Sequence, residues 1–200
     1  MSTLGTLLKD LIQLIKLPVR SRSVPDLRSR RFVAVIDCIL NQNARDAGAA
    51  RFPAMNFELL QLCHEHQVGI LQMPCPEIAV LGFKRARAPG QTIRNALDTE
   101  AGRQRCAEIA TEVVDRIEAF RAGGYVLLAV LGGNPQSPGC AVHEGESGLR
   151  NDSGVFMKQL QAEFQKRNLD ATFKSMRDHD PQLLKEDLQW FRDALVRQQA

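Results

Sequence analysis

The chain has 200 residues, of which 44% are hydrophobic and 24% are charged, and it carries a net charge of +3 at neutral pH. This length suits a single domain with a sizeable core, and the composition is that of an ordinary globular protein. The small excess of base excludes the dense basic stripe of a dedicated nucleic-acid binder, so we expect no DNA partner.

Residues 1–30 are predicted to be a unit of their own. An apolar stripe predicts an amphipathic helix, with the leucine and isoleucine positions Leu4, Leu7, Leu8, Leu11 and Ile15 on one face. The segment is too short and too charged to form a transmembrane segment, and no signal-peptide cleavage site follows it, which favours a cytoplasmic location. We expect the helix to dock on the domain or to pair two subunits in a homodimer. The basic stretch 20–31 is expected to be a solvated linker.

Residues 31–200 are predicted to form one α/β domain. Near-continuous apolar runs predict buried strands at 31–37, 68–74 and 125–132, and 171–176 is a candidate fourth strand. Strands with such runs are typical of a parallel sheet that is covered on both faces.

Helical spacing of apolar residues alternates with these strands. Helices are predicted at 57–66, at 99–122 and at 153–168, where Ser153 is the expected N-cap. A last helix is expected to begin near Pro181, because proline is favoured in the first helical turn. The alternation predicts a doubly wound, Rossmann-like parallel sheet with helices on both faces.

The cysteines fall into two groups. Cys63 and Cys106 lie inside predicted helices, where they are expected to be small core residues. Cys38 and Cys75 directly follow the first two strands, and Cys140 lies a short loop beyond the third. Because parallel strands end at the same edge of a sheet, we expect these last three thiols to meet in the crevice where doubly wound folds bind ligands.

Three converging thiols suit a metal or a cluster better than a lone nucleophile. A structural zinc site usually has four ligands and a Cys-x-x-Cys pair, which this sequence lacks. A four-iron cluster that is held by only three thiolates keeps one iron open. An odd number of cysteines without a signal peptide argues against a disulfide framework. The residues alone leave open that the three are unrelated loop cysteines.

Three motifs surround these thiols: "CILNQNA", "LQMPCPEIAVLG" and "GGNPQSPGC". In order and context they resemble the cysteine motifs of the thiouracil desulfurase family, and most closely its branch of related desulfidases. The similarity covers roughly residues 32–169. It implies a [4Fe-4S] cluster held by Cys38, Cys75 and Cys140. It also implies non-redox removal of sulfur from a small thiolated (thiocarbonyl) compound, with the substrate sulfur bound to the open iron.

Five further residues have candidate roles. Glu77 is the expected general acid or base, although a carboxylate in the first turn of a helix also has a purely structural role. Asn41, Asn43 and Arg45 are expected to contact the substrate, with turn formation as the alternative for the asparagines. Ser137 is expected to hydrogen-bond a sulfur atom of the cluster or substrate, or else to be a turn residue.

The third motif departs from the resemblance. Gly139 stands where many relatives have a serine, and Ala141 follows the cysteine where they have a glycine. The first motif continues as "ARDAG", so nucleobase specificity does not transfer. Two other functions stay open at this point: a non-catalytic module that holds a cluster or zinc for sulfur handling or sensing, and an α/β binding protein without a metal.

Overall fold

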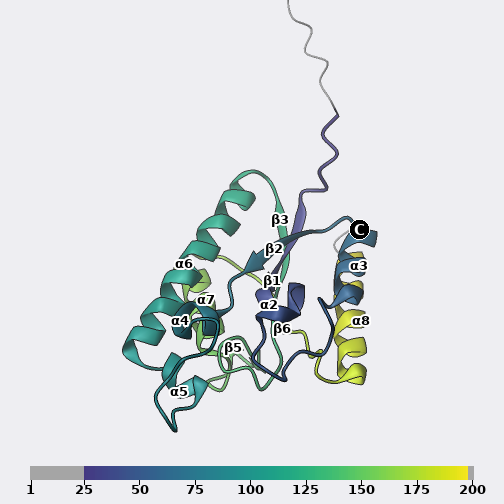
Figure 1. Cartoon of the computed structure of the whole chain (residues 1–200). Helices are drawn as coiled ribbons and strands as arrows, with labels where there is room; N and C mark the ends of the chain where they lie inside the picture. Colours follow the sequence, from purple (N-terminus) through teal and green to yellow (C-terminus); the bar gives the residue numbers. More distant parts are fainter. Residues whose placement is uncertain (1–24, 198–200) are drawn as a thin grey trace, which may run out of the picture.

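The structure is a computed structural model that describes residues 25–197 (Figure 1). The predicted N-terminal helix, and with it the expected docking or pairing of subunits, lies outside the described residues. Within the part that is described, no helix is long and apolar enough to cross a membrane.

Four parallel strands form the central sheet in the order β2-β1-β3-β6. They are β1 (Arg31–Ile36), β2 (Gly69–Met73), β3 (Val126–Gly132) and β6 (Phe173–Ser175). Each predicted strand is confirmed. The two central strands are almost entirely buried, as the unbroken apolar runs require for a sheet with both faces covered.

Helices cover both faces of this sheet, which confirms the doubly wound α/β class. In Figure 1, α6 (Glu100–Ala122) and α7 (Val155–Lys166) lie on one side of the strands, and α3 (Phe57–Glu65) and α8 (Pro181–Arg197) on the other. The predicted start of α8 at Pro181 is confirmed.

One predicted helix cap is wrong. The N-cap of α7 is Gly154, which offers no side-chain hydrogen bond, and not Ser153. The hydroxyl of Ser153 instead accepts a hydrogen bond from the backbone amide of His143 at 3.0 Å. The first amides of α7 are satisfied by carbonyls of the loop that carries Cys140, so the helix does not need a serine cap.

Several short elements were not predicted. They are α2 (Asp37–Leu40), the 3₁₀ turn η1 (Gln42–Ala44), α4 (Pro76–Leu81), α5 (Ile93–Leu97) and the hairpin of β4 (Glu144–Gly145) with β5 (Gly148–Leu149). Each is too short for apolar periodicity to reveal, and most helices of this length form only because the surrounding domain holds them.

The strand order creates the crevice in which the site lies. The connection after β1 leads outward to the edge strand β2, whereas β3 lies on the opposite side of β1 and continues toward β6. The two central strands therefore send their carboxyl-end connections away from each other, which is the topological switch point where doubly wound sheets bind ligands.

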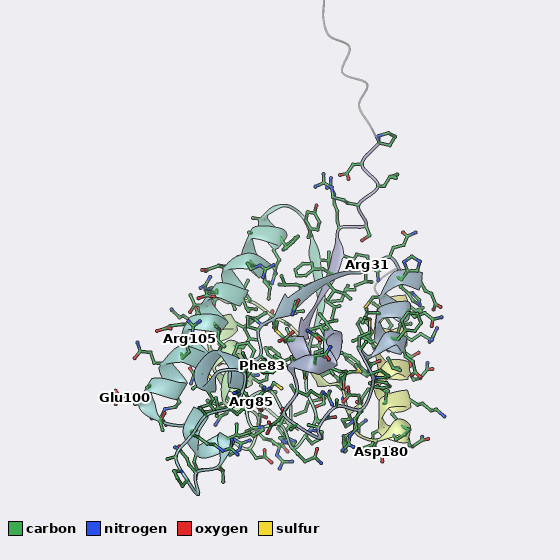
Figure 2. All side chains as sticks on the ribbon, viewed as in Figure 1. Arg31, Phe83, Arg85, Glu100, Arg105 and Asp180 are labelled. Atoms are coloured by element: carbon green, nitrogen blue, oxygen red, sulfur yellow. The ribbon has the colours of Figure 1, made fainter. Side chains whose placement is uncertain are left out.

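The interior is apolar except near this edge. Phe156, Phe164 and Phe191 are among the largest fully buried side chains. Figure 2 shows Glu100 and Arg105 on the outer side of α6, whereas Arg85 lies within the molecule. A fully buried arginine is rare in proteins, so its surroundings are a candidate location for a functional site.

Candidate functional site

A cavity of about 450 Å³ lies at the carboxyl edge of the sheet, and its wall contains Cys38, Cys75 and Cys140. The structure thus brings together three thiols that are separated by long stretches of sequence. A volume of this order suits a small-molecule ligand. All five cysteines of the chain are free thiols, and Cys63 and Cys106 lie in the hydrophobic core, as the sequence predicts.

Cys38 and Cys140 lie near each other in the cavity wall, and each affects the ionisation of the other. Cys38 lies in the first turn of α2, and a hydrogen bond with Cys140 lowers the pKa of its thiol. The same bond, together with burial, raises the pKa of Cys140 well above its usual value. The hydroxyl oxygen of Ser137 lies 3.1 Å from the Cys140 sulfur. Ionisation of one of these two thiols therefore opposes ionisation of the other.

Cys75 approaches the cavity from the second strand. It is the N-cap residue of α4, and its burial raises the pKa of the thiol to about 11. A guanidinium nitrogen of Arg85 lies 3.9 Å from its sulfur. A bound cation or a deprotonating partner is needed for this thiol to act as a thiolate at neutral pH.

Arg85 is a functional candidate that the sequence analysis missed. Its buried guanidinium donates hydrogen bonds to the carbonyls of Phe83 and Ala44, and its Nε lies 3.5 Å from Glu77. Arg85 thereby joins the segment after β2 to the segment after β1. It also supplies a positive charge beside Cys75.

Glu77 lies in the first turn of α4 and lines the same cavity. Burial raises the pKa of its carboxyl group, and the charge of Arg85 partly opposes that rise. The carboxyl group can therefore hold or release a proton close to the thiols. Both its chemical role and its structural role at the helix N-terminus are compatible with this position.

The loop with Cys140 is packed too tightly for a side chain at Gly139. A Cβ atom there would lie 2.5 Å from Cγ of Pro76, the residue after Cys75. The Pro138 and Gly139 carbonyls accept hydrogen bonds of 3.0 Å from Val155 and Phe156, the first residues of α7. The close approach to Pro76 explains why this position of the chain has glycine.

Arg45 lines the cavity but is also paired. One of its guanidinium nitrogens lies 2.7 Å from both carboxylate oxygens of Asp178, and the two side chains are 6% and 0% exposed. The positive charge of Arg45 also helps to lower the pKa of the Cys38 thiol. Its buried Nε has no hydrogen-bond partner among the described residues, so a donor remains for a bound group.

Asn41 and Asn43 are exposed, and they are not among the described residues that line the cavity. The Asn41 side chain accepts hydrogen bonds from the backbone amide and the side chain of Asn43, at 3.2 and 3.0 Å. This arrangement is a turn that begins η1, and it accounts for both asparagines without a substrate.

The structure also adds polar cavity residues that the sequence analysis did not identify. They are Asp46, Arg51, Arg85, Asn134, Gln136 and His179. Their positions gave one signal that the sequence could have offered, because Asn134 lies two residues after the end of β3 and His179 lies four residues after the end of β6. Polar residues just beyond a parallel strand face the ligand-binding edge.

A single metal ion has no ready site in this arrangement. Among residues 25–197, no three or more histidine, cysteine, aspartate or glutamate side chains are positioned to hold one ion. A polynuclear cluster separates its protein ligands more widely than one ion does, so this finding concerns single ions only.

The fold and the cavity together define a doubly wound α/β protein with a thiol-lined crevice at its switch point. No family model matches the chain. The chain is similar to an uncharacterized protein of Methanocaldococcus jannaschii, with 24% identity over 143 residues, which are 72% of this chain and 83% of that protein. No solved structure matches it.

Proposed function

We propose that the protein is a [4Fe-4S]-dependent desulfidase that removes sulfur from a small thiocarbonyl compound. The observation that carries the proposal is that Cys38, Cys75 and Cys140, which follow three different strands, line the same cavity of about 450 Å³. The ligands of the proposed cluster are these three thiolates.

The donor set fits such a group. Three sulfur donors are soft ligands, which favour iron–sulfur clusters and zinc over hard cations. Arg45 lowers the pKa of Cys38, and a nitrogen of Arg85 lies 3.9 Å from the Cys75 sulfur. Two of the three thiolates would therefore have a guanidinium group nearby to offset their charge. The unpartnered Nε of Arg45 adds a buried hydrogen-bond donor.

When bound, the cluster would supply a Lewis-acidic iron with an open coordination position, which suits a soft sulfur atom. The reaction consumes one water and converts the thiocarbonyl carbon to a carbonyl, with release of hydrogen sulfide. Glu77 would take a proton from the attacking water or give one to the departing sulfur. Ser137 would donate a hydrogen bond to the Cys140 sulfur and tune its basicity.

The rest of the wall would bind and orient the substrate. Arg51, His179 and Gln136 contribute polar side chains to the cavity. Such groups can pair with the donor and acceptor edge of a small heterocycle. The proposal also implies a reducing compartment such as the cytoplasm, because oxidised thiols would not hold iron.

Anaerobic reconstitution with iron and sulfide tests the metal part of the proposal. We expect a brown protein that contains about four iron and four sulfide per chain. The Cys106→Ala variant is the matched control, because this thiol is also buried but lies in the apolar core. Zinc in place of iron would support a non-catalytic zinc module, and a colourless, metal-free protein would reject the cluster.

Sulfide release from thiolated nucleobases and other thioamides tests the catalytic part. The reconstituted protein is expected to release sulfide from at least one of these compounds, and the metal-free protein from none. A fully loaded cluster that yields no sulfide from any compound in the panel would favour the alternative function, a cluster-binding module for sulfur handling or sensing.

A further inference from the structure

We infer that Asp178 is a positioning residue that fixes the spacing between the two walls of the cavity. One wall is the segment 38–51 after β1, which contains Cys38. The other is the loop 133–140 after β3, which contains Cys140. The inference does not depend on the proposed function, because it concerns the distance between two thiols whatever they bind.

The sheet does not connect the two walls through backbone hydrogen bonds. The paired residues of β1 and β3 extend only to Val35 and Leu131. Beyond them the chains diverge at the switch point, and no backbone hydrogen bond among the described residues joins the segment 38–51 to the loop 133–140. Their separation must therefore be set by side chains.

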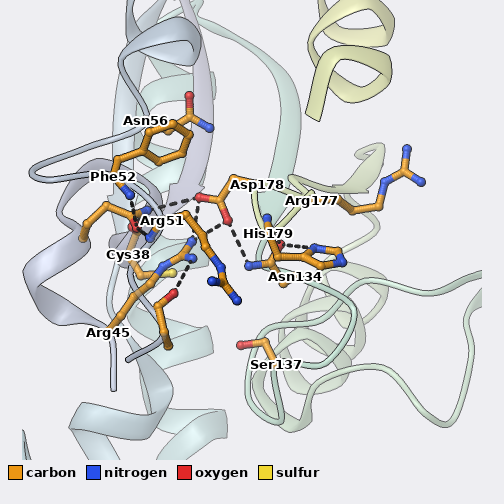
Figure 3. Close-up of polar contacts among 12 residues, drawn as sticks. Cys38, Arg45, Arg51, Phe52, Asn56, Asn134, Ser137, Arg177, Asp178 and His179 are labelled. Carbon is orange, nitrogen blue, oxygen red and sulfur yellow. Dashed lines mark hydrogen bonds and ion pairs between the residues drawn. The ribbon is translucent and has the colours of Figure 1, made fainter. Parts of the chain in front are cut away.

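Asp178 makes this connection from a third segment, the one that follows β6. Its fully buried carboxylate accepts hydrogen bonds from Arg45 and, at 3.1 Å, from Gln42, both on the first wall. It also accepts a hydrogen bond of 2.9 Å from the side-chain amide of Asn134, which begins the second wall. Figure 3 shows Asp178 between Arg45 and Asn134.

Asn134 is itself held in one orientation. Its side-chain oxygen accepts hydrogen bonds from the backbone amide of His179 at 3.2 Å and from the ring Nδ1 at 2.9 Å. The amide nitrogen of Asn134 is therefore directed at Asp178. The network joins both walls to the segment after β6. Each carboxylate oxygen of Asp178 accepts two hydrogen bonds, so the carboxylate restrains both walls at once.

Loss of stability alone would not test this role. Replacing Asp178 leaves the buried charge of Arg45 without a partner, which destabilises a protein wherever the pair lies. Asp187, on α8, provides a matched control. Its carboxylate is 1% exposed and lies 2.6 Å from the guanidinium group of Arg177, and neither residue is among those that line the cavity. Asn134→Ala is a milder variant that keeps the Arg45–Asp178 pair.

The test measures how readily one reagent bridges Cys38 and Cys140. Metal-free, reduced full-length protein is treated with dibromobimane, which becomes fluorescent when it alkylates two neighbouring thiols, and the bridged peptides are identified by mass spectrometry. We expect bridging of Cys38 to Cys140 to slow about tenfold in Asp178→Asn and in Asn134→Ala, because a small misplacement of reacting groups costs much of the rate. Asp187→Asn should bridge at the wild-type rate.

Two results would overturn the inference. One is wild-type bridging in Asn134→Ala, which is decisive even if Asp178→Asn does not fold. The other is equal slowing in Asp178→Asn and Asp187→Asn at equal thermal stability. Because the protein is metal-free in this test, absence of a cluster in wild-type protein would reject the proposed function and leave this result unaffected.

Discussion

Two groups of buried thiols in this molecule differ in the polar groups that lie beside them. Cys63 and Cys106 are 1% and 0% exposed among apolar side chains of α3 and α6, and Cys75 and Cys140 are only 8% and 4% exposed at the carboxyl edge of the sheet. The thiols at the edge have a guanidinium, a hydroxyl or a second thiol beside them. Burial alone therefore does not separate a structural cysteine from a candidate ligand; position at a strand end does.

The largest expected effect comes from removing one thiol of each group. Cys75→Ala should abolish both cluster incorporation and sulfide release, because two thiolates cannot hold the cluster as three do. Cys106→Ala should keep both and lose only a modest amount of stability, since a buried thiol behaves as a small apolar group. Iron and sulfide per chain, measured after anaerobic reconstitution, check the difference.

Equal iron contents in Cys75→Ala and Cys106→Ala would remove the distinction between the two groups. The thermal unfolding midpoints of both variants serve as the control, because a variant that does not fold would also bind no iron. A folded Cys75→Ala protein that still binds a full cluster would reject the assignment of this thiol as a ligand.

A smaller effect is expected for the carboxyl group of Glu77, which lines the same cavity as Cys75. Glu77→Gln keeps the shape of the side chain and removes its ability to exchange a proton. Sulfide release should fall by about 10²- to 10⁴-fold while iron content stays unchanged, as for the loss of a general acid or base. Turnover kinetics on the reconstituted protein measure this change, and wild-type turnover would leave Glu77 with only its structural role in α4.

The sequence predicted the fold well but the cavity only in part. Apolar runs and turn residues predict β1, β2, β3 and the long helix α6, because these elements follow from local periodicity. The sequence could predict that the three thiols meet at one edge of the sheet, because parallel strands end on the same side. These predictions use only rules that hold for every doubly wound sheet.

The polar wall of the cavity could not be predicted in the same way. Asp178 lies 133 residues from Arg45 along the chain, and no periodicity relates the two. Arg85 has Lys84 and Arg87 near it in the sequence, which gives no sign of a site, and only folding brings it beside Cys75. Contacts of this kind form only when two loops that are distant in sequence pack against each other in the folded domain.

The contact between Gly139 and Pro76 tests how tightly the edge is packed. Gly139→Ala should destabilise the protein by about 1–3 kcal/mol, as overpacking does, because its Cβ would lie 2.5 Å from Cγ of Pro76. Gly69→Ala is the control, since the nearest atom to its Cβ would be 3.5 Å away. Urea unfolding measures both changes.

The double variant Gly139→Ala with Pro76→Ala sharpens this test. Removing Cγ of Pro76 should recover part of the stability that Gly139→Ala loses, so that the two changes are not additive. Additive losses would mean that the new methyl group is accommodated elsewhere, and the packing of the second motif against the third would then not explain the glycine.

The smallest effect concerns the thiols of the apolar core. Burial raises the pKa of Cys63 to about 12, from an ordinary value of 9.0. Because the thiol ionises more readily in the unfolded chain, its contribution to stability is complete below pH 9 and is lost as the pH rises toward the folded-state pKa.

At pH 10 the wild-type protein should therefore have lost about 1 kcal/mol more of its free energy of unfolding, relative to pH 8, than Cys63→Ala. Urea unfolding of both metal-free proteins at the two pH values checks this difference. The thiols at the edge of the sheet are common to both proteins, so their titration cancels in the comparison. Equal losses in the two proteins would mean that Cys63 is accessible to water, and the contrast between the two groups of thiols would then rest on the cavity alone.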